Sequence, residues 1–178
     1  MNKWKTTSGA AGCAVAAVLA FVAGTNHELK TSEDGLAFMA GLEGCKSSAY
    51  QCSANVWTIG LGHTQGVKQG DTAEVPEIGQ WFIDDIAAAE NVVNGQVQLT
   101  TGPKFDMAVS FVMNLGAGNF RRSTYLKKLK AGELDAACNE FTRWVYVNGK
   151  DCRVDASNCK GIVKRRERER GICLNGYQ

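Results

Sequence analysis

Beyond about its first thirty residues, the chain carries hydrophobic side chains mostly at the three- and four-residue spacing of a buried helix face. Pro76 suits the first turn of one such helix, because that turn leaves its backbone N–H groups without helical partners and proline has none. The segment after Pro76 is therefore predicted to be helical. Its stripe consists of Ile78, Phe82, Ile86, Ala89 and Val93.

Other segments share this spacing. Residues 31–34 place hydroxyl side chains before two acids, as at a helix N-terminus, and Leu36, Met39 and Glu43 follow at helical intervals. We expect the acids to favour the helix because they interact well with the positive end of its dipole. Further helices are predicted over 105–115, 119–130, 134–144 and 161–173.

Residues 50–63 break the helical pattern. Trp57, Thr58 and Ile59 stand among glycines there, which indicates short strands and turns. The sequence thus predicts an α+β fold that is mainly helical, with one small β-rich insertion near its start. The body of the chain, residues 28–178, is long enough for a single domain with two lobes and a real core.

The N-terminal residues 1–27 are predicted to be a membrane-directed segment. Lys3 and Lys5 precede residues 8–24, which carry no charge. As a helix this stretch would measure about 25 Å, slightly less than a bilayer core of about 30 Å, and it is only weakly apolar. The lysines predict a cytoplasmic N-terminus with the body outside. Three interpretations stay open: a cleaved signal peptide, a permanent anchor, and an uncleaved anchor that later leaves the membrane.

Composition and charge narrow the function classes. Hydrophobic residues make up 44% and charged residues 21% of the chain, as in ordinary globular proteins. The net charge of +2 is too small to indicate nucleic-acid binding, and no nucleic-acid partner is expected. Residues 160–170 are mostly basic but contain Glu167 and Glu169. We interpret this run as a solvated helix face with ion pairs, and contact with an anionic wall or lipid is the alternative.

The cysteine content indicates an oxidising compartment. Seven is an odd number, so one thiol is left over when the others pair within the chain. No CxxC pair occurs, and the histidines do not stand at zinc-ligand spacing, so neither a metal nor another cofactor is predicted. The cysteines are Cys13, Cys45, Cys52, Cys138, Cys152, Cys159 and Cys173.

Glu43 is the strongest candidate for chemistry. It ends a predicted helix directly before the β-rich insertion, where a cleft between two lobes would form. A partly desolvated glutamic acid has a raised pKa and can protonate a glycosidic oxygen. Because a glutamate at a helix end is common, Glu43 alone does not establish this function.

The spacing around Glu43 resembles that of the T-even-phage-type lysozymes. Position 52 follows Glu43 by nine residues and Thr58 by fifteen, which is similar to that family's Glu–Asp–Thr pattern. Residues 58–63, TIGLGH, are similar to its T-[IV]-G-x-G-H signature. Residues 108–120, 143–146 and 161–167 resemble motifs of the lambdoid-phage members. The resemblance covers most of residues 32–173.

This resemblance implies a two-lobed, lysozyme-like domain with a small β-hairpin lobe. It also implies muramidase activity on the β-1,4 bond that follows N-acetylmuramic acid in peptidoglycan. Glu43 would be the general acid, and Thr58 would orient the attacking water. His63 is expected to support the strand that carries Thr58. Asn114 is expected either to contact substrate or to cap a helix before Gly116.

Position 52 departs from the family, because Cys52 stands where the family has Asp. A thiol of ordinary pKa is only partly ionised at neutral pH, so Cys52 stays open as a base, a nucleophile or a spacer. Some phage endolysins with a signal-anchor-release (SAR) segment have cysteines at the same sites as Cys13, Cys45 and Cys52. In such a scheme a Cys45–Cys52 disulfide keeps the enzyme inactive. Cys13 attacks Cys45 once the N-terminal segment that carries Cys13 leaves the membrane.

The other cysteines are expected to form structural bridges, Cys138–Cys173 and Cys152–Cys159. The alternative for Cys45 and Cys52 is a permanent disulfide, and for Cys13 a small apolar position in a helix. In the exchange scheme one thiol is always unpaired, that of Cys13 before the exchange and that of Cys52 after it, so a monomer accounts for the odd number of cysteines.

The expected partners are peptidoglycan, the host inner membrane through residues 8–24, and a cooperating holin. The expected location is the periplasmic side of the host inner membrane, followed by release into the periplasm. Two other functions stay open: a lytic transglycosylase, and a wall-binding protein that has lost activity.

Overall fold

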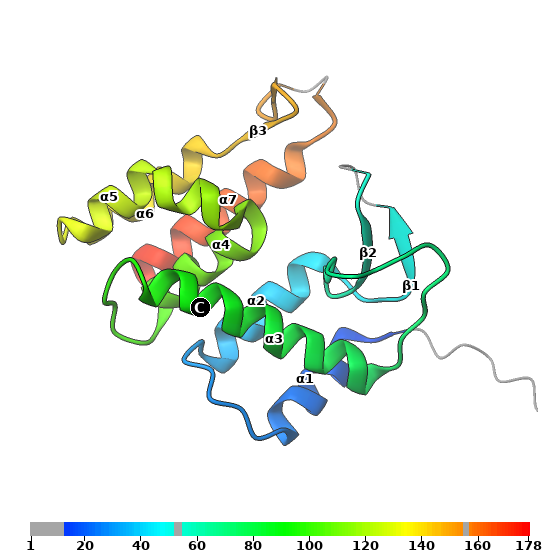
Figure 1. The fold of residues 1–178 in the computed structure, drawn as a ribbon. Coiled ribbons are helices and arrows are strands. Elements are labelled where there is room, and N and C mark those ends of the chain that lie inside the picture. The colour runs from blue at the N-terminus through cyan, green and yellow to red at the C-terminus, as the bar shows by residue number, and fades with distance from the viewer. Residues whose placement is uncertain (1–12, 52–54, 155–156) are drawn as a thin grey trace, which may run out of the picture. The chain divides into compact units, whose positions relative to one another are not determined.

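The computed structural model describes residues 13–51, 55–154 and 157–178, and within them the fold is mainly helical, as predicted (Figure 1). The helices are α1 (Val15–Gly24), α2 (Glu33–Glu43), α3 (Val75–Asn94), α4 (Pro103–Arg122), α5 (Thr124–Lys130), α6 (Leu134–Cys138), the 3₁₀ helix η1 (Asn139–Arg143) and α7 (Lys160–Asn175). The antiparallel strand pairs are β1 (Lys46–Gln51) with β2 (Trp57–Gly60), and β3 (Tyr146–Val147) with β4 (Lys150–Asp151).

The chain forms two compact units. The β unit contains the described residues of 1–26 together with 43–82, and the helical unit contains 27–42 and 83–178. The predicted β-rich insertion corresponds to β1 and β2 of the β unit. The second strand pair, β3 and β4, belongs to the helical unit and was not predicted from the sequence.

In the β unit, β2 lies between β1 and the start of α3. Thr58 pairs with Tyr50 in the β1–β2 ladder. At the end of β2, Gly60 has φ +64°, and a β-carbon there would lie 2.8 Å from the side chain of Ile78. The position therefore requires glycine both for its backbone angle and for its close packing on α3.

Helix α1 packs into the β unit with one face buried. Val18 and Val22 are buried, and Phe21 lies against Gly79 of α3. The outward positions are exposed alanines: Ala14, Ala16, Ala17, Ala20 and Ala23.

The membrane segment predicted over 8–24 corresponds only in part to α1. The helix has ten residues and begins at Val15, and residues 8–12 lie outside the described part of the chain. Among the described helices, none has both the length and the apolar character needed to cross a bilayer.

The helical unit is built around α4. Helix α7 packs against α4, α6 and η1, as Figure 1 shows. Phe111 of α4 is completely buried, and its ring lies 5.2 Å from Tyr125, 5.9 Å from Phe141 and 5.0 Å from Trp144 between centroids. Aromatic packing of this kind joins α4, α5 and the η1 segment into one core.

The predicted helices 119–130 and 134–144 are each divided in the structure. Helix α4 extends to Arg122, with a kink at Gly116 where φ is +81°. Ser123 then starts a new helix, because its hydroxyl accepts a hydrogen bond from the Leu126 N–H at 3.0 Å. The second segment is α6 followed by the 3₁₀ helix η1.

Two carboxylates hold the start of α2. Ser32 is its N-cap: the hydroxyl accepts from the Gly35 N–H at 3.1 Å and donates to the buried Asp106 at 2.5 Å. Just before it, Glu90 of α3 accepts from the Thr31 N–H at 2.7 Å and from the Thr31 hydroxyl at 2.6 Å. The polar run at 31–34 thus marks a helix start, as predicted, and both buried carboxylates are satisfied by hydrogen bonds.

The basic run of α7 is only partly solvated, which corrects the sequence interpretation. Arg166 is 1% exposed and donates to Glu169, which is 0% exposed. Glu169 also accepts from Ser110 at 2.8 Å and from Arg165 at 3.1 Å. This buried pair is therefore part of the core between α7 and α4.

Two disulfides lie within the helical unit. Cys138 of α6 is joined to Cys173 of α7, and Cys152 is joined to Cys159 across the loop that follows β4. Cys138, Cys152 and Cys173 are buried. The pairs are the two that the sequence suggested.

Candidate active site

Glu43 is the last residue of α2, and its side chain is exposed. Gly44 follows with φ +66°, a left-handed angle that ends the helix and turns the chain into β1. Cys45 comes next. The sequence folds locally so that a carboxylate stands at the end of a helix, directly before the β hairpin.

The turn after β2 lies against Glu43. Gly62 has φ +96°, and a β-carbon on it would come within 3.6 Å of both Cγ and Oε2 of Glu43. Thr58, four residues earlier, is 4% exposed, and its hydroxyl donates to the Val56 carbonyl at 3.1 Å. That hydroxyl keeps oxygen lone pairs that can accept a hydrogen bond from water. The structure therefore brings Glu43 together with the TIGLGH segment that begins at Thr58.

His63 stabilises this turn. Its backbone N–H and C=O pair with Ile59, both at 2.9 Å. Its ring stacks on Trp81 of α3, with centroids 4.9 Å apart and planes 9° apart. His63 thus contacts the strand that carries Thr58 through backbone bonds, in line with its expected supporting role. Trp81 was missed in the sequence, because nothing in the spacing of residues 63 and 81 indicates that the rings meet.

Cys45 is bonded to Cys13, with their α-carbons 5.3 Å apart. This is the pair expected after Cys13 has attacked Cys45, and it joins the start of α1 to the segment directly after Glu43. Cys52, the third member of the expected exchange, lies outside the described residues.

Asn114 is a half-buried residue of α4, two positions before the kink at Gly116. Its side-chain oxygen accepts a hydrogen bond from Arg166, which also donates to the Trp144 carbonyl at 3.1 Å. Burial lowers the pKa of the Arg166 guanidinium, and the charge of Glu169 opposes that shift. The Asn114 oxygen is therefore oriented by a buried cation.

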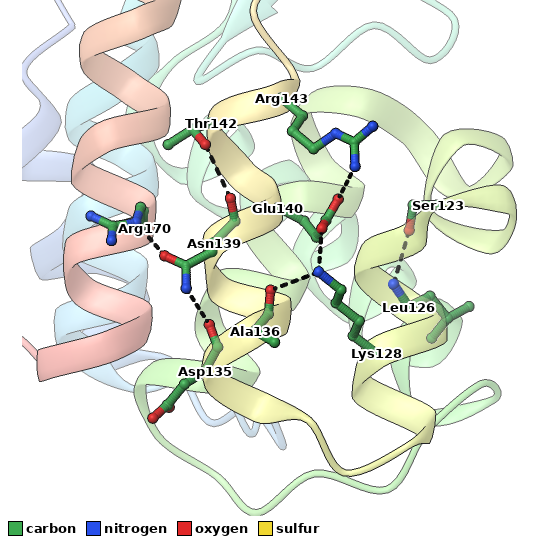
Figure 2. Close-up of polar contacts among 10 residues, drawn as sticks. All are labelled: Ser123, Leu126, Lys128, Asp135, Ala136, Asn139, Glu140, Thr142, Arg143 and Arg170. Atoms are coloured by element: carbon green, nitrogen blue, oxygen red, sulfur yellow. Dashed lines mark hydrogen bonds and ion pairs between the residues drawn. The ribbon is translucent and has the colours of Figure 1, made fainter.

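Leu115, the residue after Asn114, lines a pocket of about 410 Å³. Glu140 lies in its wall and accepts from Lys128 at 2.5 Å and from Arg143 at 3.4 Å, as Figure 2 shows. Glu140 is 5% exposed, so the two cations balance a nearly buried carboxylate. The pocket is lined by Leu115, Arg122, Ser123, Thr124, Glu140, Arg143, Trp144 and Tyr146.

Within the part of the chain that the structure describes, no group of three or more His, Cys, Asp or Glu residues is arranged to hold a metal ion.

Comparison with known proteins yields one matching family and close relatives. The model of the family described as Phage lysozyme matches residues 40–169. A protein named SAR-endolysin from Enterobacteria phage PA-2 is 37% identical over 144 residues, which cover 78% of this chain and 81% of the relative.

Solved structures of one endolysin match to different degrees. The active form of P1 phage endolysin Lyz superposes with a TM-score of 0.81 at 29% identity, covering 94% of this chain and 97% of the other. The secreted inactive form of P1 phage endolysin Lyz superposes with a TM-score of 0.54 at 28% identity, covering 82% and 96%. The overall fold is thus closer to the first of these forms.

Proposed function

This chain belongs to the phage lysozyme family, and we propose that it hydrolyses the β-1,4 bond between N-acetylmuramic acid and N-acetylglucosamine in bacterial peptidoglycan. The observation that carries this proposal is the position of Glu43 against the turn after Thr58, with Gly62 beside the carboxylate. A carboxylic acid can protonate the leaving oxygen and a hydroxyl can orient the attacking water, so these two side chains supply two of the roles that glycoside hydrolysis requires.

In the proposed reaction Glu43 gives its proton to the glycosidic oxygen as the bond between that oxygen and the sugar carbon breaks. A water held by the Thr58 hydroxyl attacks the carbon. The thiolate of Cys52 accepts the proton of that water, since a thiolate is a stronger base than the carboxylate usual at this position. Asn114 is proposed to contact the substrate.

The proposed control is a disulfide exchange. In the silent form Cys45 is bonded to Cys52. When the Cys13 thiolate attacks Cys45, the Cys13–Cys45 bond forms, the Cys45–Cys52 bond breaks, and Cys52 leaves as a thiolate. Two facts support this scheme: the structure holds the Cys13–Cys45 bond, and its fold superposes better on the active than on the secreted inactive form of P1 phage endolysin Lyz.

We further propose that residues 1–27 tether the chain to the periplasmic face of the host inner membrane until release, and that 28–178 form the catalytic domain. The uncharged stretch 8–24 supports this assignment. The released protein acts as a monomer on the wall, after a holin has disturbed the membrane. Host cell lysis is the result.

The deciding experiment is Glu43→Gln in the purified chain, assayed on isolated peptidoglycan, with Glu167→Gln on the exposed face of α7 as the matched control. Loss of cleavage in Glu43→Gln alone is the expected result. Product masses then separate a hydrolase from a transglycosylase, whose anhydro product lacks one water. Unchanged clearing by Glu43→Gln would contradict the proposal and favour a wall-binding protein.

The regulation has its own test. Cys13→Ser should be inactive when purified under oxidising conditions and should gain activity with a mild reductant. Cys13→Ser/Cys45→Ser should be active without reductant, because Cys52 then has no partner. Equal activity of all forms would refute the exchange while leaving the hydrolase proposal intact.

A further inference from the structure

Phe21 of α1 packs tightly against Gly79 of α3. A β-carbon built on Gly79 would lie 2.3 Å from Cδ1 and 2.9 Å from Cε1 of Phe21. Real β-carbons do not approach other atoms so closely, because packed atoms repel strongly below van der Waals distance. The Phe21 ring therefore occupies space that only glycine leaves open.

The contact is aligned with the buried face of α1. Val18 and Val22 are 0% and 2% exposed, and Phe21 lies three residues after the first of them, on the same side of the helix. Two residues before α1 begins, Cys13 is bonded to Cys45. One short helix is thus held at one end by a covalent bond and at the other by a ring packed on glycine.

The disulfide depends on this packing for a thermodynamic reason. An intramolecular disulfide is favoured in proportion to the effective concentration at which the fold holds its two sulfurs. With α1 docked, Cys13 is kept near Cys45. With α1 displaced, Cys13 moves on a flexible tether and its effective concentration falls.

We propose that Gly79 is the docking position for Phe21 and that this contact sets how strongly Cys45 prefers Cys13 as its disulfide partner. The proposal rests on the exchange described above as the regulation of the enzyme. It adds that the choice of partner is made by noncovalent packing of Phe21 on Gly79 in the β unit.

The first experiment measures the formation of the Cys13–Cys45 disulfide alone. In full-length Cys52→Ser chains, the Cys13–Cys45 bond is titrated against a glutathione series and quantified by alkylation and mass spectrometry. Gly79→Ala is expected to lower its equilibrium constant roughly 5- to 150-fold, the range for overfilling a packed site. Gly171→Ala is the matched control, because that α7 glycine has nothing within 4 Å of an added β-carbon.

A second variant removes the contact from the other side. Phe21→Ala creates no clash and should also weaken the Cys13–Cys45 bond, so the test does not depend on the folding of Gly79→Ala. Since the clash needs the ring, Gly79→Ala should have little further effect once Phe21 is alanine. Equal constants for Gly79→Ala, Gly171→Ala and the parent, or no effect of Phe21→Ala, would overturn the proposal.

The same variants are then compared with Cys52 present. Gly79→Ala should shift the population from Cys13–Cys45 toward Cys45–Cys52, and an unshifted population would overturn the claim about partner choice. No step requires peptidoglycan, so a chain without hydrolase activity would still give a readable result. Failure of the proposed function and failure of this inference are therefore distinguishable.

Discussion

Gly62 lies against the side chain of Glu43, with its added β-carbon position 3.6 Å from Oε2. Because φ at Gly62 is +96°, a residue with a β-carbon would strain the backbone at a point that contacts the carboxylate. The turn that links β2 to His63 is thus shaped to pass close to the acid. This relationship brings the end of the TIGLGH segment, which begins at Thr58, against the carboxylate of Glu43.

Thr58→Val should separate catalysis from folding. Valine matches threonine in shape, so β2 should still form, but the hydroxyl that is proposed to orient water is gone. We expect the rate of peptidoglycan cleavage to fall about a hundredfold, as for a misplaced reactant, while Thr58→Ser keeps most activity. Turbidity loss of purified sacculi measures both. Full activity in a folded Thr58→Val chain would show that Thr58 is structural.

The two disulfides of the helical unit should differ in their contribution to stability. Cys138 and Cys173 are 35 residues apart, whereas Cys152 and Cys159 are 7 apart. Loop-closure entropy predicts losses of about 4 kcal/mol for the long loop and about 2.5 kcal/mol for the short one when both cysteines become alanine. Denaturant unfolding checks the order. A larger loss for the short loop would rule out the entropic account here.

Removing one partner of the buried Arg166–Glu169 pair should lower the stability of the protein. In Arg166→Met the carboxylate of Glu169 stays buried without its main cation, and we expect a loss of about 3–5 kcal/mol in the free energy of unfolding. Arg166→Met/Glu169→Leu should lose less than the sum of the single changes, since it leaves no unpaired charge. Urea unfolding of the four chains completes the cycle, and additive losses would mean that the two side chains act independently.

The β3–β4 hairpin provides a prediction on pH. Hydrogen bonds from Arg153 lower the pKa of Asp151 from 3.8 to about 2. A depressed carboxyl pKa means that the folded state favours the charged form of Asp151. The stabilisation of the fold by the Asp151–Arg153 interaction is therefore complete above pH 3.8 and is lost as the pH falls toward 2. Carbon-detected NMR titration should find this pKa. In Arg153→Gln it should return toward the ordinary value, and an unchanged pKa would exclude Arg153 as the cause.

The helices were predictable where one apolar face stays buried along their whole length, as in α3. The division at Ser123 was not, because apolar spacing continues from Phe120 to Leu126 across it and only the cap hydroxyl interrupts the helix. Arg166 and Glu169 were assigned to a solvated face, since charged residues in a run usually face water. Their burial depends on packing against α4, which local sequence does not reveal.

The candidate site could be predicted as far as its motif reaches. Glu43 and Thr58 were identified from their spacing, and the structure brings the turn after Thr58 against Glu43. The stack of His63 on Trp81 and the contact of Phe21 with Gly79 join segments separated by a loop or by most of the β unit. Such contacts leave no periodic signal, because each depends on how two surfaces meet in space.

The exposed alanines of α1 have a consequence for solubility. A helix that leaves lipid must present to water the side that it does not bury, and the exposed apolar area of alanine is small. If the segment acts as the proposed anchor, leucine at Ala16, Ala20 or Ala23 would strengthen the anchor but would expose a continuous apolar surface after release, which favours aggregation. Under the proposed tethering and release, the weak hydrophobicity of this segment is therefore a compromise between lipid and water.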